Sequence, residues 1–166
     1  MAPFIKLFWG FLFLFDFNIG SFDILPDVVG YLFFYLGLSE LSINSRYFET
    51  ARWLSVPLIF IGVIDLFPVN SIIINIVTFI LSLLLIYNIT RGVGEMAKNV
   101  GNFLFEEKAR KRWVIYLYTN VVSFLLIMLG FLVPVLLVIA VIPLVIAMLV
   151  IYIMLMLLMK EANEVL

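Results

Sequence analysis

The sequence predicts an all-α membrane protein, a polytopic helical bundle that forms a single transmembrane domain over residues 1–166. The first observation is composition: 66% of the residues are hydrophobic and only 13% are charged, whereas soluble domains carry about 25% charged residues. The second is that six apolar segments follow one another, separated by short polar stretches or prolines. A soluble fold of this size cannot bury so much apolar surface, so we expect lipid to surround most of it.

The six apolar segments differ in length. They comprise residues 3–15, 28–41, 53–67, 71–89, 113–133 and 134–159. A helix needs about 20 residues to cross a hydrocarbon core about 30 Å thick. The last three segments are long enough, whereas the first three are too short unless their flanks extend them. We therefore expect six transmembrane helices in three hairpins, or alternatively four spanning helices and a re-entrant first pair.

The basic residues all sort to one side of the six-crossing arrangement. With the N-terminus inside, all 10 Lys and Arg fall inside: at Lys6, in the second and fourth connections, and near the C-terminus. All Glu residues also fall inside, and all Asp residues fall toward the outside. Positive charge collects on the cytoplasmic side of membrane proteins. We therefore predict that both termini are cytoplasmic.

The polar stretch at residues 91–112 has two interpretations. Val93, Met96, Val100 and Phe103 recur at helical spacing and form one apolar face. The segment is therefore an amphipathic helix in the cytoplasmic interface, or else an extension of the fourth or fifth crossing. The basic cluster at its end, residues 108–112, fixes the topology or also attracts anionic lipid headgroups.

Small and polar side chains inside the apolar segments predict the faces on which the helices pack together. Such residues face the interior of membrane bundles, where they allow close approach and hydrogen bonding. In the fourth segment they recur at i, i+4, i+7 and i+11, which is one helical face that also holds Asn75. The predicted packing seam comprises Ser71, Thr78, Ser82, Tyr116, Asn120, Ser123, Gly30 and Gly37.

Two of the four aspartates are the candidates for a site. At about 1.5 Å per residue, Asp16 and Asp65 lie roughly 15–18 Å along their helices, which is below the outer headgroups. A lone carboxylate at this depth is costly, so we predict that the two share an outward-open polar recess. Asp23 and Asp27 are interpreted as turn and helix-start residues. The predicted polar or cation site comprises Asp16, Asp65, Asn18, Asn70 and Asn75.

Several kinds of chemistry are excluded by composition. The chain has no Cys and no His, so it cannot form disulfides, thiolate nucleophiles, imidazole bases or ordinary zinc sites. No motif pairs acidic residues with a nucleophile or a metal site. The sequence therefore predicts a protein that is not an enzyme, has no metal or cofactor, and does not bind nucleic acid.

The segment at residues 15–31 reads FDFNIGSFDILPDVVGY. Its core is FDILPD, followed by a Gly-Tyr pair at the start of an apolar helix. Over about the first 40 residues, the chain resembles small, little-characterised integral membrane proteins of Gram-positive bacteria. Some proteins of that kind are thought to regulate extracytoplasmic-function sigma factors. The resemblance implies a bacterial cytoplasmic (inner) membrane and supplies no site residues.

Two functions fit these observations. The first is a non-enzymatic membrane protein that binds a membrane or cytoplasmic partner, as a regulator, an accessory subunit or an assembly factor. Its partners would be membrane lipids together with another protein or a second copy of the chain. The alternative is a small proton- or cation-coupled carrier or channel that uses Asp16 and Asp65. A carrier should gather its carboxylates around a solvated cavity, whereas a partner-binding protein should have them dispersed.

Overall fold

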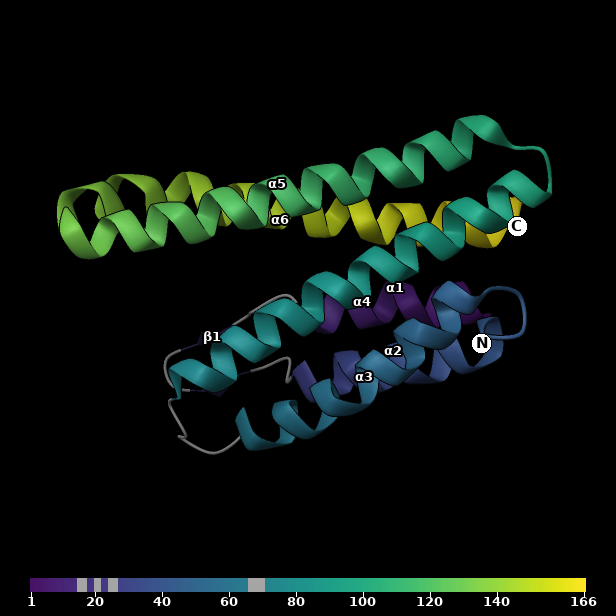
Figure 1. The fold of residues 1–166 in the computed structure, drawn as a ribbon, viewed down its shortest axis with the longest axis horizontal. Helices are drawn as coiled ribbons and strands as arrows, with labels where there is room; N and C mark the ends of the chain where they lie inside the picture. Colours follow the sequence, from purple (N-terminus) through teal and green to yellow (C-terminus); the bar gives the residue numbers. More distant parts are fainter. Residues whose placement is uncertain (15–17, 20–21, 24–26, 66–70) are drawn as a thin grey trace.

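The computed structural model describes residues 1–14, 18–19, 22–23, 27–65 and 71–166, and this part of the chain is almost entirely helical. The predicted helical bundle is therefore confirmed (Figure 1). A two-residue antiparallel strand pair follows the first helix, with Asn18 opposite Asp23. The elements are α1 Pro3–Phe13, β1 Asn18–Ile19, β2 Phe22–Asp23, α2 Asp27–Leu41, α3 Arg46–Asp65, α4 Ile72–Asn99, α5 Phe103–Leu132 and α6 Pro134–Val165.

Successive helices run in opposite directions. Both termini and the connections α2–α3 and α4–α5 lie at one end of the molecule, on the right in Figure 1. We call this end the basic end, because the predicted inside Lys and Arg residues lie on these termini, connections and adjoining helix turns. The opposite end, where Val133 joins α5 to α6, is the far end.

The six helices form a closed ring. Each helix packs against the helices before and after it in the chain, and α6 also packs against α1. Glycine makes the α1–α2 contact close: a Cβ at Gly30 would lie 2.9 Å from the carbonyl oxygen of Gly10. A Cβ at Gly37 would lie 2.8 Å from the carbonyl oxygen of Pro3. Both glycines of the predicted seam are therefore buried where two helices meet.

The helices differ in whether they are long enough to cross a membrane. Four of the described helices, α3 to α6, are long and apolar enough to do so. α1 has 11 residues and α2 has 15, which is roughly 16 and 22 Å at 1.5 Å per residue. Both are shorter than a hydrocarbon core of about 30 Å. The ring therefore contains four full-length helices and one hairpin of short helices.

Residues 91–112 extend two long helices and form no separate interfacial helix. Arg91 to Asn99 is the last part of α4, and α5 begins at Phe103. Gly101 has a φ of 77°, a left-handed conformation that favours glycine and lets the chain reverse. Asn102 then caps α5, because its Oδ1 accepts a hydrogen bond from the N–H of Phe105 at 3.1 Å. The structure thus has the second of the two arrangements considered above.

Candidate functional site

A polar cavity of about 190 Å³ lies between the helices of the ring. Its lining comes from the end of α1 at Leu14 and from α2, α4, α5 and α6. Among the lining residues that the structure describes, none is a lysine or an arginine, and one is a carboxylate. Asp27 is therefore the one acidic or basic side chain among the described lining residues. Its polar lining residues are Asp27, Tyr31, Thr78, Ser82, Tyr116, Asn120 and Tyr152.

The cavity lies near the middle of the long helices. Ser82 is nine residues along α4 from Arg91, which is about 14 Å at 1.5 Å per residue. Asp27 is thirteen residues along α2 from Glu40, which is about 20 Å by the same arithmetic. A hydrocarbon core is about 30 Å thick. In a bilayer whose inner boundary follows the basic end, the cavity would therefore be at about half depth.

The cavity carboxylate sits at the start of a short helix. Asp27 is the first residue of α2 and is partly buried. The N–H groups of a first turn have no partner within their own helix, and they carry partial positive charge. They stabilise a carboxylate at this position. Tyr31 follows one turn later and therefore shares the face that Asp27 occupies, so both side chains reach the cavity from α2.

Hydrogen bonds set the character of the cavity wall. The hydroxyls of Tyr31 and Ser82 are 3.3 Å apart and join α2 to α4. The Thr78 hydroxyl donates to the carbonyl of Ile74 at 2.9 Å, so the remaining capacity of that oxygen is to accept. Asn120 donates through Nδ2 to the carbonyl of Tyr116 at 2.9 Å, and its Oδ1 is an acceptor. The wall therefore offers oxygen acceptors around the carboxylate.

Aromatic rings close the side of the cavity toward α5 and α6. Tyr116 is 3% exposed, and its ring packs edge-on against that of Tyr152, with centroids 6.4 Å apart. Trp113 packs on Tyr116 at 6.0 Å on the side nearer the basic end. Aromatic faces attract cations that come within about 6 Å of the ring. The side of the cavity toward α5 and α6 is therefore lined by tyrosine rings and their hydroxyl groups.

The structure describes three of the five residues of the predicted polar or cation site, Asn18, Asp65 and Asn75. Asp16 and Asn70 lie outside the described residues, and Asn18 is described only as part of β1. Asp65 is the last residue of α3 and is exposed. Asn75 is exposed on α4. The proximity of Asp16 to Asp65 therefore stays a prediction.

The predicted packing seam contributes more to the cavity. Four of its members line it, namely Thr78, Ser82, Tyr116 and Asn120. Ser123 is buried and donates to the carbonyl of Thr119, and Ser71 is partly buried just before α4. Asn75 is exposed, whereas we expected the whole polar face of the fourth segment to turn toward protein or a wet cavity.

Sequence reasoning missed three of the polar lining residues, Asp27, Tyr31 and Tyr152. Asp27 was interpreted only as a helix-start residue, although its spacing to Tyr31 places both on one face. Tyr152 could have been predicted from the sequence, because it is the one polar side chain in the apolar stretch of residues 134–159. A single polar residue in such a stretch faces the bundle interior.

Comparison with known proteins gives no relative: no protein-family model, no curated protein and no solved structure matches the chain.

Proposed function

We propose that the chain is an integral membrane protein that binds a small cation or protonated amine in its central cavity, as part of a carrier or channel. This is the second function considered from the sequence, with Asp27 in the place given there to Asp16 and Asp65. The observation that carries the proposal is the position of the Asp27 carboxylate, which lines a polar cavity together with hydroxyl and amide groups from α2, α4, α5 and α6.

The energetics of a membrane interior support this proposal. A charged Asp at the centre of a membrane helix costs roughly 2.5–3.5 kcal/mol on insertion scales, so carboxylates at this depth mark ion and proton pathways. A packing role alone would be filled at lower cost by an apolar residue. The polar residues that line the cavity with Asp27 come from α2, α4, α5 and α6.

The short helices support it as well. In many membrane carriers, helices that end near the bilayer midplane present their termini to the bound solute. Irregular backbone is tolerated at that depth only where protein or water covers it. Here Asp27 begins α2, and Leu14 follows the last residue of α1; both residues line the cavity. A cavity of 190 Å³ fits a partly hydrated ion or a small amine.

The proposed location is a bacterial cytoplasmic membrane, with the basic end in the cytoplasm. Four helices long and apolar enough to span a membrane support a membrane location. Collection of the termini and basic connections at one end of the bundle supports the orientation (Figure 1). We propose no catalytic activity, metal or cofactor.

Binding to a protein partner, the first function considered from the sequence, has one supporting observation. The α5–α6 hairpin extends beyond the other helices at the far end (Figure 1). Its exposed side chains there are apolar, as at Leu125, Val138 and Ile142, which are 53%, 76% and 67% exposed. A regulator or accessory subunit would use this surface to pack against a transmembrane helix of its partner or of a second copy.

Uptake of cations into vesicles tests the primary proposal. The full-length chain would be reconstituted, and uptake of protons, Na⁺, K⁺ and methylammonium followed with trapped indicators or radioactive tracer. We expect Asp27→Asn to abolish uptake of the transported cation, because the amide keeps the shape of the side chain and removes its charge. Asp65→Asn is the matched control, since Asp65 is exposed at the end of α3, and it should retain uptake.

The opposite pattern, with uptake lost in Asp65→Asn and kept in Asp27→Asn, would return the function to the site predicted from sequence. Absence of uptake for all four cations in the unmodified protein would leave partner binding as the better account.

A further inference from the structure

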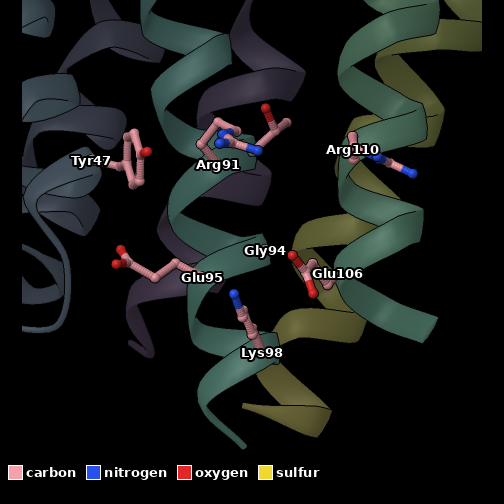
Figure 2. Close-up of a pocket in the computed structure, with 8 residues that line it drawn as sticks. Tyr47, Arg91, Gly94, Glu95, Lys98, Glu106 and Arg110 are labelled. Atoms are coloured by element: carbon pink, nitrogen blue, oxygen red, sulfur yellow. The ribbon is translucent and has the colours of Figure 1, made fainter. Parts of the chain in front are cut away.

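A second polar pocket, of about 190 Å³, lies at the basic end between α3, α4 and α5. Figure 2 shows Tyr47 on one side, the α4 residues in the middle, and Glu106 on the α5 side. Arg110 extends away from the other labelled side chains and marks the rim. This pocket is separate from the central cavity, with which it shares no lining residue.

The pocket has a surplus of positive charge. Its charged lining residues are Arg91, Glu95, Lys98, Glu106 and Arg110. Glu95 accepts a hydrogen bond from the hydroxyl of Ser45 and points away from Lys98 (Figure 2). Within the described residues, neither Arg91 nor Lys98 forms an ion pair, and the Arg91 guanidinium lies 5.7 Å from the ring centre of Tyr47. Two cations are therefore held beside the pocket without an acidic partner.

A glycine keeps the floor of this pocket open. Gly94 lies within α4, and a Cβ built there would touch nothing closer than 3.7 Å, at Glu106 Cγ. Glycine inside a helix costs about 1 kcal/mol relative to alanine, and here close helix packing does not require it. Gly92 is different, because a Cβ there would lie 2.7 Å from the Phe48 ring. Gly94 lines the pocket on the same helical face as Arg91 and Lys98, so a larger side chain there would take up space beside these two cations.

An apolar stripe continues from the pocket along the outer face of α4. Counting from Arg91 toward the far end, residues at alternating steps of four and three positions lie on the same helical face. These residues are Tyr87, Leu84, Ile80 and Val77. Leu84, Ile80 and Val77 on this stripe are 45%, 50% and 42% exposed. Ile80 is eleven residues from Arg91, which is about 16 Å along the helix. That is about half of a 30 Å hydrocarbon core, the reach of an acyl chain in one leaflet.

We propose that this pocket and the outer stripe of α4 together form a binding site for one anionic phospholipid of the phosphatidylglycerol type. Arg91 and Lys98 hold its phosphate above Gly94, Glu106 accepts hydrogen bonds from the glycerol hydroxyls of the headgroup, and an acyl chain lies along Tyr87, Leu84 and Ile80. The site goes beyond the proposed function. It shares with that function only the membrane location and makes no use of Asp27.

Lipid retention by the purified chain tests this site. The full-length protein in mild detergent would be titrated with dioleoylphosphatidylglycerol or dioleoylphosphatidylethanolamine, and bound lipid counted by native mass spectrometry. We expect one phosphatidylglycerol to be retained in preference to phosphatidylethanolamine. Arg91→Gln and Lys98→Gln should each weaken its retention roughly five- to tenfold, as expected for the loss of one cation beside a headgroup. Both side chains are exposed, so these variants leave the core intact.

Two further variants separate the site from a general charge effect. Lys160→Gln removes an exposed cation from α6 at the same end of the molecule, outside the pocket, and should leave retention unchanged. Gly94→Leu fills the pocket without changing any charge and should weaken retention as much as Arg91→Gln does. Added inorganic phosphate should not compete at millimolar concentration, because it lacks the acyl chain.

Equal losses in Lys160→Gln and Arg91→Gln would overturn the proposal, since binding would then follow net charge alone. Equal retention of the two lipids would also overturn it, because the ammonium group of phosphatidylethanolamine would then satisfy Glu106 as well. Competition by inorganic phosphate would instead assign the pocket to a soluble anion. None of these results depends on whether the central cavity takes up cations.

Discussion

The basic end and the far end of the molecule are built differently. In α4 the buried residues all lie from Leu85 onward, and in the described part of α6 they begin at Ile151. At the basic end all six helices are present, and ion pairs join Lys6 to Glu40 and Lys108 to Glu161. At the far end α1 and α2 are absent because they are short, so the long helices lose these neighbours.

This difference shows where the fold is held together. The buried residues of α4 and α6 and the cross-helix ion pairs are concentrated toward the basic end. The apolar side chains of the far end are exposed, and they need lipid or another apolar surface around them. The central cavity lies at the boundary between these regions, where the short hairpin ends. A short hairpin inside a ring of longer helices thus creates both the exposed far end and the position of the cavity.

Two phenylalanines on α3 give the sharpest test of this difference. Phe48 is 0% exposed and Phe60 is 67% exposed. We expect Phe48→Ala to lower the free energy of unfolding by about 3–5 kcal/mol, because it leaves a cavity in the core. Phe60→Ala should change it by less than about 0.5 kcal/mol. Reversible unfolding in mixed micelles, followed by far-ultraviolet circular dichroism, measures both. Similar losses in the two variants would contradict the uneven distribution of packing.

Two glycines provide a test of smaller magnitude. Gly30→Ala should destabilise the protein by about 1–3 kcal/mol, because the added Cβ would lie 2.9 Å from the backbone oxygen of Gly10. Gly94→Ala makes only ordinary contacts, and it should stabilise by up to about 1 kcal/mol through helix propensity. The same unfolding measurement compares them. If Gly94→Ala were the more harmful change, then α4 and α5 would approach more closely than they do in this structure.

Much of the fold could be predicted from the sequence because long apolar runs predict long helices. The last three segments were identified nearly at their observed positions for this reason. The helices α4 and α5 extend further than predicted, because residues 91–99 and 103–112 are polar and nevertheless helical. Polarity marks where a helix leaves the apolar region, and it does not mark where the helix ends.

The cavity was harder to predict because it depends on how helices that are distant in sequence are arranged. Spacing within one helix found Thr78 with Ser82 and Tyr116 with Asn120, which are shared faces of single helices. It could not show that α2 would bring Asp27 and Tyr31 to those faces. That requires knowing that α6 closes the ring against α1, and nothing in the local pattern of either helix specifies this contact. Asp27 also has a sufficient local explanation as an acidic residue in the first turn of a helix. Its place in the cavity lining was therefore not predicted.

Labelling of Asp27 with dicyclohexylcarbodiimide tests whether the central cavity binds a cation. This apolar reagent modifies protonated carboxyl groups within a membrane, and peptide mass spectrometry locates the adduct. We expect Asp27 to be modified in reconstituted protein, and the transported cation should slow this modification in proportion to its occupancy of the cavity. Asp27→Asn should remove this adduct and leave labelling elsewhere unchanged. If no cation changes the rate at which Asp27 is modified, the cavity is not a cation site.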